Sequence, residues 1–283
     1  MAESVQIIAP AKINLSLDVL GKREDGYHQV SMIMQTISLA DTITLEKTAR
    51  GISLTCDNPA LPVNEGNLAY RAAVVFKQAT GYSGGVEINI SKRIPVEAGL
   101  AGGSTDAAAV LKGLNDLTGN RLEDDQLRTL GAALGSDVPF CISGGTALAT
   151  GRGELIQPLR PVPQLNIIVV KPPFGVSTAK VYGRLDLKKV TDRPDTEAML
   201  EAIAAGDAQR IIALGANVLE SVTLKEYPPV EILKNRLKQL GAEGVLMSGS
   251  GPTVFGFVKT PEQGQAIAGQ IGDLGQAWVV TTL

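Results

Sequence analysis

The amino-acid sequence predicts an α+β protein of two domains. Strand-like and helical segments are mixed along the chain, and hairpin-like pairs of strands fall in its first half, which is typical of the α+β class. Three prolines lie between Pro158 and Pro163 and indicate a crossing between domains, because clustered prolines interrupt regular structure. Residues 1–158 and residues 159–283 are therefore the two predicted domains.

The first part of the chain alternates in the manner of a strand. Apolar residues at positions 13, 15, 17 and 19 are interleaved with Asn14, Ser16 and Asp18, and Gly21 follows them. Side chains of a strand point alternately to its two faces, so this strand is expected to have one apolar and one polar face. Further strands are predicted at residues 43–47, 52–56 and 86–90.

Helix signals follow in the same half of the chain. Asn67 is the predicted N-cap of a helix that ends near Gly81. A second helix is predicted to begin around residues 104–106 and to end at Gly119 as its C-cap. A third is predicted from about residue 123 to residue 134.

The second half repeats the mixture of elements. A buried strand is predicted at residues 165–171, a helical region at residues 196–220, and a helix after two prolines at positions 228 and 229. Strands at residues 245–248 and 253–258 flank a tight glycine turn. Thr260 and Pro261 then predict the start of a last helix, because proline is favoured at a first helical position, and a terminal strand is predicted at residues 277–281.

Composition excludes several classes of function. The formal net charge is -3, which offers no basic surface for nucleic acid or anionic membrane. No stretch approaches the roughly 18 uninterrupted apolar residues that a membrane span needs, so the protein is expected to be cytoplasmic. The two cysteines, Cys56 and Cys141, allow a disulfide, but buried thiols are the expected state in that compartment.

A glycine-rich turn joins the strand at residues 86–90 to the second helix. It comprises Pro95, Val96, Glu97, Ala98, Gly99, Leu100, Ala101, Gly102, Gly103, Ser104 and Thr105. A helix start carries unpaired N–H groups and a partial positive charge, so it attracts anions. Glycines let the backbone approach an anion closely. A mere tight connection is the alternative, but the proline lead-in, three glycines and two hydroxyls together favour a phosphate site. The spacing is neither that of a Walker A motif nor that of a dinucleotide-binding turn.

Five motifs in order resemble the GHMP kinases, a family of small-molecule kinases. The segment from Pro95 to Ala108 is similar to that family's phosphate-binding motif. PAKINL at residues 10–15 is similar to its first motif, and SGSGPT at residues 248–253 to its third, with Ser248, Gly249, Ser250 and Gly251 in the turn. DGYH at residues 25–28 and GSDVPF at residues 135–140 resemble the members that act on a cytidine-diphosphate polyol.

The resemblance implies a fold and a reaction. It implies an N-terminal ATP-binding domain like domain 2 of ribosomal protein S5 and a C-terminal ferredoxin-like α/β sandwich. It also implies transfer of the γ-phosphate of ATP, carried with Mg²⁺, to a tertiary hydroxyl of the polyol. Glu97 and Ala98 depart from the more glycine-rich loops of some members, and Met34 stands where some carry an aromatic residue in the cytidine pocket.

Lys12 and Asp137 are the predicted catalytic pair. Taken singly, Lys12 is a surface lysine by default and Asp137 a turn residue that caps the next element. Within the matched motifs, Asp137 is expected to accept the proton of the substrate hydroxyl. Lys12 is expected to keep Asp137 ionised and to stabilise the developing charge. Val138 and Pro139 are expected to hold the chain extended after Asp137.

Substrate-binding residues are predicted from the same motifs. Tyr27 is expected to stack on the cytosine and His28, the single histidine, to hydrogen-bond its edge, since imidazole can donate and accept. Tyr182, shortly after Thr178, is either the opposite face of that sandwich or a core tyrosine. Asn14 is expected to bind the polyol.

Asn67 and Leu68 are expected near the adenine, besides beginning a helix. Ser104 or Thr105 would contact Mg²⁺, and no permanent protein metal site is predicted. Other GHMP kinases acting on homoserine, mevalonate or a sugar, and a non-catalytic ligand sensor on the same fold, remain alternatives, as do a monomer and a homodimer.

Overall fold

The computed structural model describes residues 3–283, which form two compact units interleaved along the chain. Unit 1 comprises the described residues up to Ala11 together with Leu39–Ile94 and Ala101–Gly144. Unit 2 comprises Lys12–Ser38, Pro95–Leu100 and Gly145–Leu283. The boundary at residue 158 stays a prediction. Within residues 3–283, no helix is both long and apolar enough to cross a bilayer.

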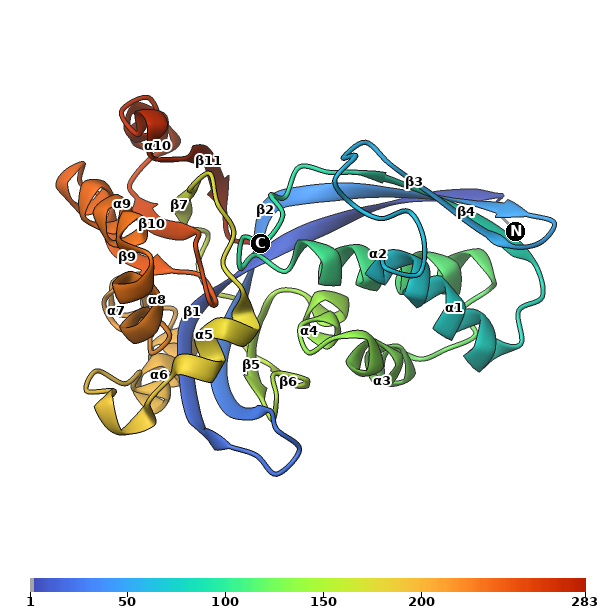
Figure 1. Ribbon diagram of the computed structural model, residues 1–283, viewed down its shortest axis with the longest axis horizontal. Coiled ribbons are helices and arrows are strands. Elements are labelled where there is room, and N and C mark those ends of the chain that lie inside the picture. Colours follow the sequence, from blue (N-terminus) through green and yellow to red (C-terminus); the bar gives the residue numbers. More distant parts are fainter. Residues whose placement is uncertain (1–2) are drawn as a thin grey trace. The chain divides into compact units, whose positions relative to one another are not determined.

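Two long strands, β1 (Ser4–Lys22) and β2 (His28–Thr48), contribute residues to both units (Figure 1). They belong to a sheet with the order β3-β4-β2-β1-β8, in which β5 also pairs with β2 and β6 with β5. The shorter strands are β3 (Ile52–Cys56), β4 (Gly85–Ser91), β5 (Thr146–Thr150), β6 (Leu155–Pro158) and β8 (Ala216–Asn217).

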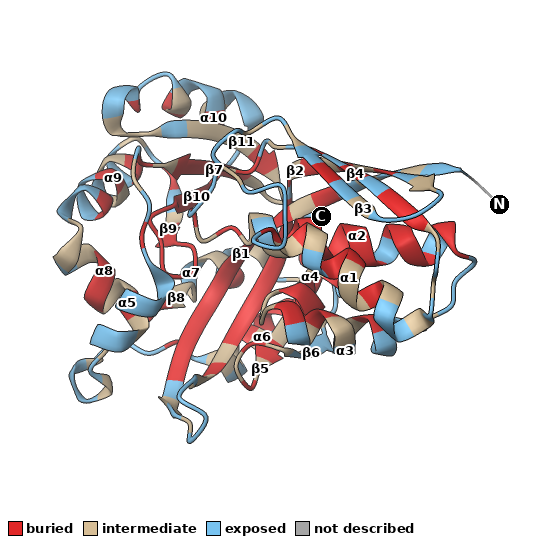
Figure 2. Cartoon of the chain, turned by 45° about the vertical axis from the view of Figure 1, so that its right-hand side comes forward, coloured by how far each residue is buried: buried red, intermediate tan, exposed pale blue. Residues whose placement is uncertain are grey.

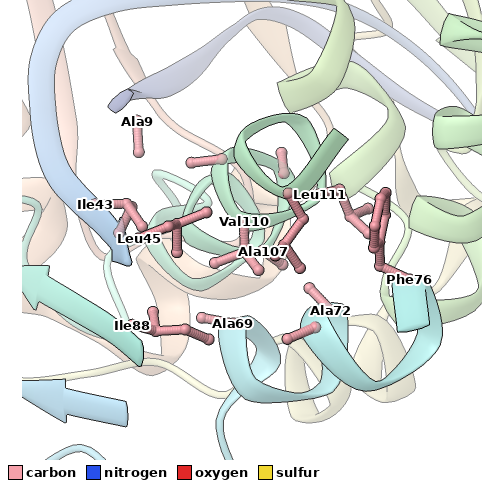
Figure 3. Packing of buried hydrophobic residues seen from close by; sticks show 14 of the residues in the cluster. Ala9, Ile43, Leu45, Ala69, Ala72, Phe76, Ile88, Ala107, Val110 and Leu111 are labelled. Carbon is pink, nitrogen blue, oxygen red and sulfur yellow. The ribbon is translucent and has the colours of Figure 1, made fainter. Parts of the chain in front are cut away.

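Unit 1 packs four helices with its part of this sheet. They are α1 (Leu68–Thr80), α2 (Gly102–Leu117), α3 (Asp124–Leu134) and α4 (Val138–Ser143). The facing surfaces of α1 and α2 are rich in alanine, including Ala69, Ala72 and Ala107 (Figure 3). Small side chains let two helix backbones approach closely, while Leu45 and Phe76 fill the larger spaces of the core, as close packing requires. The start of α2 is thereby held by packing along the whole helix.

Several predictions for unit 1 need correction. Helix α2 begins at Gly102, earlier than expected, and its C-cap is Thr118 rather than Gly119. The chain after Asp137 is not extended, because α4 starts at Val138 with a proline in its first turn, a position at which the missing N–H costs no hydrogen bond. Cys56 and Cys141 are half-buried rather than buried, and no disulfide joins these two described residues.

Asn67 is the N-cap of α1, as the sequence predicts. Its side-chain Oδ1 accepts a hydrogen bond from the backbone N–H of Ala69 at 2.9 Å, and its Nδ2 donates to the carbonyl of Pro62 at 2.9 Å. The opposite end of α1 closes at Gly81 with φ 66°. Both termini of this helix therefore use the residue types that satisfy orphan backbone groups.

Asn67→Ala is expected to lower the free energy of unfolding by about 1 kcal/mol, since the first turn of α1 loses its capping oxygen. Asn67→Asp keeps that oxygen but loses the donor to Pro62, so its stability should fall between the two. Urea denaturation of the three proteins checks the order. Equal stability of Asn67→Ala and the native chain would contradict a capping role.

Unit 2 contains a four-stranded antiparallel sheet in the order β11-β7-β10-β9. Its strands are β7 (Asn166–Lys171), β9 (Glu243–Met247), β10 (Val254–Val258) and β11 (Gln276–Thr281). Helices α9 (Pro228–Gln239) and α10 (Pro261–Ala268) pack on these strands. The remaining helices of the unit are α5 (Thr178–Arg184), α6 (Thr196–Ala205), α7 (Ala208–Ala213) and α8 (Glu220–Glu226).

The helical region expected at residues 196–220 is interrupted by a strand. It is divided into α6, α7, the short strand β8 and the start of α8. Gly206 ends α6 in the left-handed conformation, and β8 pairs in parallel with β1 through Ser16 and Leu17. Residues 196–213 are largely helical, as expected, but pairing with a distant strand ends the helical region at β8.

Both faces of β1 are buried between Lys12 and Val19, in the part of the strand that belongs to unit 2. Asn14, Ser16 and Asp18 are as inaccessible as the apolar residues between them, and Figure 2 shows this part of the strand in red. The strand also continues to Lys22, past the predicted end at Gly21. A buried row of polar side chains along one face of a strand is costly unless each finds a partner, so this row marks the part of unit 2 to examine for function.

Candidate active site

Lys12 heads the buried polar row of β1. Only 4% of the residue is exposed, and its Nζ donates a hydrogen bond to Oδ1 of Asn14 at 2.8 Å. Nδ2 of Asn14 in turn faces Sδ of Met32 at 3.5 Å. The default of a solvated surface lysine is therefore excluded, since this ammonium is held at a defined place by its neighbours.

The backbone of Lys12 also meets the first part of the glycine-rich turn. Its N–H donates to the carbonyl of Leu100 at 3.2 Å. In this segment Glu97 and Gly99 have φ of 52° and 71°, and a non-glycine residue in that region is strained. Glu97 thus adopts a backbone conformation that suits glycine.

The second glycine turn, Ser248–Gly251, connects β9 to β10 and lies against Gly99. Oγ of Ser248 donates to the carbonyl of Gly99 at 3.0 Å. A Cβ built on Gly99 would be 2.3 Å from the carbonyl oxygen of Ser248, and one built on Gly249 would be 3.6 Å from Nζ of Lys12. Within unit 2, the two glycine turns and the Lys12 ammonium are therefore immediate neighbours.

The side chain of Asn217 binds the backbone of this second turn. Its Nδ2 donates to the carbonyls of Met247 and Gly249, both at 2.8 Å. Asn217 was not identified from the sequence, because residues 196–220 were expected to form a helical region. No local signal distinguishes this asparagine, since its partners lie 30 and 32 residues further along the chain.

The remainder of the phosphate motif lies in unit 1, at the start of α2. Ala101 is the N-cap in the left-handed conformation, with φ 60°, and its side chain makes no capping hydrogen bond. Gly103 is exposed and Ser104 half-buried. The first N–H groups of α2 have no carbonyl within the helix to bind, so they are oriented to receive an anion.

The two hydroxyls at this helix start differ in their surroundings. Oγ1 of Thr105 donates to the carbonyl of Pro10 at 2.8 Å, and the residue is 1% exposed. Its hydroxyl is thus used to tie α2 to β1. Ser104 is the more accessible of the two, and a phosphate or Mg²⁺ ligand at this position stays a prediction.

Asp137 lies in the same unit as the start of α2. Oγ of Ser104 is 4.0 Å from the position that a Cβ on Gly135 would occupy, two residues before Asp137. Asp137 precedes α4, but its side chain makes no capping hydrogen bond with that helix, so the alternative of a simple capping residue is not what the structure shows. Lys12 belongs to unit 2, and the pairing of Lys12 with Asp137 stays a prediction.

Asn67 and Leu68, predicted near the adenine, lie beside the phosphate motif of unit 1. Cδ1 of Leu68 is 3.6 Å from the position of a Cβ on Gly103. Asn67 is committed to capping α1 through both ends of its amide. Leu68 is therefore the better placed of the two to line a base pocket, while Asn67 holds the helix that carries it.

Unit 2 brings together two of the residues predicted to bind a pyrimidine. The rings of His28 and Tyr182 have centroids 5.2 Å apart and are tilted by 41°. Burial, and to a lesser degree the charge of Lys22, lower the pKa of His28 below its ordinary value of 6.5. The imidazole is therefore neutral at neutral pH, the state in which it can donate one hydrogen bond and accept another.

Tyr27 has a different environment. The residue is 53% exposed, and the guanidinium of Arg152 lies over its ring at 4.8 Å from the centroid. This is a cation–π contact, in which arginine is a common partner. Arg152 was not identified from the sequence, because it lies far from Tyr27 along the chain. Met34 is fully buried and pairs in the ladder with Ala147 of β5.

Thr178 is joined to the second glycine turn. The hydroxyls of Thr178 and Ser250 are 2.8 Å apart, and Oγ1 of Thr223 donates to the carbonyl of Ser250 at 3.1 Å. Thr178 begins α5, the helix that also carries Tyr182. One helix of unit 2 therefore contacts both the glycine turn and the His28 ring.

Comparisons with known proteins agree with this geometry. The GHMP kinases N terminal domain matches residues 67–145, and the GHMP kinases C terminal domain matches residues 199–277. A 4-diphosphocytidyl-2-C-methyl-D-erythritol kinase of Acetivibrio thermocellus is 49% identical over 261 residues, covering 92% of each chain. One of Shouchella clausii is 56% identical over 254 residues, covering 89% of this chain and 85% of its own.

Solved structures show the same architecture. A crystal structure of 4-(cytidine 5'-diphospho)-2C-methyl-D-erythritol kinase superposes with a TM-score of 0.85 at 37% identity, covering 98% of this chain and 99% of that one. Homoserine kinase from Cytophaga hutchinsonii has a TM-score of 0.79 at 20% identity, with 100% and 95% covered, which shows a shared fold. The predicted α+β, two-domain fold and the predicted family are confirmed, and the chain belongs to the GHMP kinases.

Proposed function

We propose that the chain transfers the γ-phosphate of ATP to the 2-hydroxyl of 4-diphosphocytidyl-2-C-methyl-D-erythritol, a step of non-mevalonate isoprenoid precursor synthesis. Relatives about half identical to it carry the name of that kinase. The observation that carries the proposal is the place of Lys12, whose backbone binds the first glycine turn and whose ammonium adjoins the second. A cation fixed among anion-binding turns is what phosphoryl transfer requires.

ATP is bound through backbone groups in this proposal. The N–H groups at the start of α2 and the turns around Gly99 and Gly249 receive the triphosphate, because amide dipoles bind anions without a basic surface. Such local binding fits a formal net charge of -3. Mg²⁺ enters with the nucleotide, and Ser104 supplies a hydroxyl to it or to a phosphate. Leu68 packs against the adenine.

Asp137 and Lys12 carry out the chemistry on the acceptor. Asp137 accepts the proton of the tertiary hydroxyl, whose oxygen bonds to the γ-phosphorus while the bond from that phosphorus to the bridging oxygen breaks and ADP leaves. Lys12 stabilises the negative charge that develops on the transferred phosphoryl group. Its hydrogen bond to Oδ1 of Asn14 restrains the ammonium, and Asn14, on the same face of β1 as Lys12, binds the polyol.

The cytidine is recognised by aromatic residues of unit 2. His28, neutral at neutral pH because of its lowered pKa, both donates to and accepts from the edge of the cytosine. Tyr182 provides one stacking face and Tyr27 the other. Arg152, which lies over Tyr27, orients that ring and offers a cation toward the diphosphate. These residues separate the acceptor from homoserine, mevalonate and sugars, which have no base to stack.

A coupled assay of ADP release tests the substrate. We expect turnover with the cytidylated methylerythritol and none with homoserine, mevalonate or galactose at equal concentration. Preferred turnover of homoserine, mevalonate or galactose would overturn the substrate assignment but would leave the kinase activity supported. Absence of ADP release with every acceptor, combined with ligand binding, would favour a sensor on the same fold. The cytoplasmic location and the monomer or homodimer state remain predictions.

Tyr182→Leu is expected to raise KM for the cytidylated acceptor about three- to tenfold, since the base loses an aromatic face, while KM for ATP stays within twofold. Tyr70→Leu removes a half-buried tyrosine from α1 of unit 1 and serves as the matched control, with neither KM changed. Initial rates at saturating ATP and then at saturating acceptor give the two constants. If the KM for the acceptor is unchanged in Tyr182→Leu, Tyr182 is a core tyrosine and does not stack on the base.

A further inference from the structure

Unit 1 contains a buried charge cluster that the reaction above does not use. Nζ of Lys92 forms ion pairs with Oδ2 of Asp41 and with Oδ2 of Asp106, the latter at 2.7 Å. The side chains of Lys92, Asp41 and Asp106 are 6%, 0% and 4% exposed. Three ionisable groups so far from water are expensive, and apolar residues of the same volume would cost less. Stability alone therefore gives no reason for such a cluster.

The cluster joins the three segments that surround the start of α2. Asp41 lies on β2, Lys92 directly follows β4, and Asp106 lies in the second turn of α2. Oδ1 of Asp41 also accepts hydrogen bonds from the backbone N–H groups of Arg93 and Ile94, the latter at 2.8 Å. The chain that leads into the phosphate motif and the helix that follows the motif are thus fixed to the same ammonium.

The ammonium lies directly beside the first residue of α2. A Cβ on Gly102 would be 3.4 Å from Nζ of Lys92 and 3.1 Å from Cγ2 of Ile94. Gly102 therefore packs closely against the cluster, with little room for a side chain on the side of Ile94. A displacement of Lys92 would remove the support under the N–H groups that bind phosphate in the proposed function.

The carboxyl group of Asp106 lies in an environment that is unfavourable for its charge. Its Oδ1 is buried without a hydrogen-bond partner among the described residues. Burial raises its pKa to about 7, against the opposing effect of Lys92. A structural ion pair would normally satisfy both oxygens of its carboxylate. The Asp106 carboxyl group has a partner for only one of its two oxygens and lies near a helix start that can bind an anion. Local destabilisation of this kind is often found at functional sites.

We propose that Lys92, with Asp41 and Asp106, positions the start of α2 so that its N–H groups meet the ATP phosphates. The three are positioning residues, because they act through the backbone of Gly102 and its neighbours. This inference rests on the proposed ATP-binding function but not on the identity of the acceptor. Nucleotide affinity is therefore the quantity that it predicts.

Lys92→Met keeps the aliphatic stem of the side chain and removes the ammonium. We expect the Kd of a non-hydrolysable ATP analogue with Mg²⁺, measured by calorimetry, to rise at least tenfold, since small displacements of binding groups cost up to about 100-fold. KM for ATP should rise in parallel, whereas KM for the acceptor should stay within twofold. Asp106→Asn retains an oxygen for Lys92, so its analogue affinity should stay within threefold of the native chain.

Leu54→Ala is the control for lost stability. Leu54 belongs to β3 and to the same hydrophobic core, and its truncation leaves a cavity that lowers the denaturation midpoint. Below that midpoint its analogue affinity should be native. If Lys92→Met does not fold, Lys92→Met/Asp106→Asn also removes one of the two buried carboxylates left without an ammonium, while Asp41 keeps its hydrogen bonds from the N–H groups of Arg93 and Ile94. The same loss of affinity is expected.

Two results would overturn the proposal. One is native analogue affinity in the folded Lys92→Met or double variant. The other is an equal change of both KM values, as a general loss of structure would give. Because the analogue needs no acceptor, a native chain that binds it but turns over no acceptor leaves the cluster supported and the substrate assignment refuted. A native chain that does not bind the analogue refutes the proposed function, and with it the role of the cluster.

Discussion

Asp137→Asn is expected to reduce kcat by about 10²–10⁴-fold, the range that a positioned general base contributes. The amide occupies the same volume but cannot accept the proton of the tertiary hydroxyl. Because the aspartate and asparagine side chains have the same shape, the substitution should leave the fold and the KM for ATP nearly unchanged. Single-turnover phosphoryl transfer and a thermal melt measure the two quantities separately.

Asp116→Asn is the control, since it exchanges an exposed carboxylate on α2 that the proposed mechanism does not use. Its kcat should be native. Lys12→Met should also lose most of the activity, and the Lys12→Met/Asp137→Asn double variant should be little worse than either single one, because groups that act as a unit are not additive. Losses that multiply in the double variant would show that the two residues work independently, and native kcat in Asp137→Asn would remove it from catalysis.

The phosphate motif could be predicted from sequence because its requirement is local. Gly99, Gly249 and Gly251 have φ of 71°, 57° and 85°, and glycine is the residue that adopts such angles without strain. The capping role of Asn67 is equally local, since donor and acceptor are two residues apart. Motifs of this kind need only the neighbouring residues to be recognised.

Other parts of the site depend on contacts between distant residues. Lys92 and Asp41 are 51 positions apart, and Lys92 and Asp106 are 14 apart. Nothing in the local pattern around Asp41 distinguishes it from an exposed strand aspartate. Asn217 lay within a predicted helical region, but it belongs to β8, which pairs with β1, and its amide donates to the carbonyls of Met247 and Gly249 in the tertiary structure. Tertiary pairing decided these features.

The relation between Gly99 and Ser248 gives a prediction with a large expected effect on both stability and nucleotide binding. A Cβ on Gly99 would lie 2.3 Å from the backbone carbonyl oxygen of Ser248, a distance at which one of the two turns must move. Gly99→Ala is therefore expected to raise the KM for ATP by roughly 100-fold, the cost of misplacing binding groups by about 1 Å. Initial rates over a range of ATP concentrations measure it.

Gly206→Ala separates this clash from ordinary backbone strain. Gly206 has φ 68°, nearly that of Gly99, but a Cβ there would meet nothing within 4 Å. Each substitution should cost about 1–2 kcal/mol for placing an L-residue in the left-handed region, and only Gly99→Ala should cost more and lose ATP affinity. Equal denaturation midpoints and equal KM values in the two variants would mean that the contact between the glycine turns is dispensable. A selective effect of Gly99→Ala would mean that the close approach of these two turns is itself a condition for binding the nucleotide.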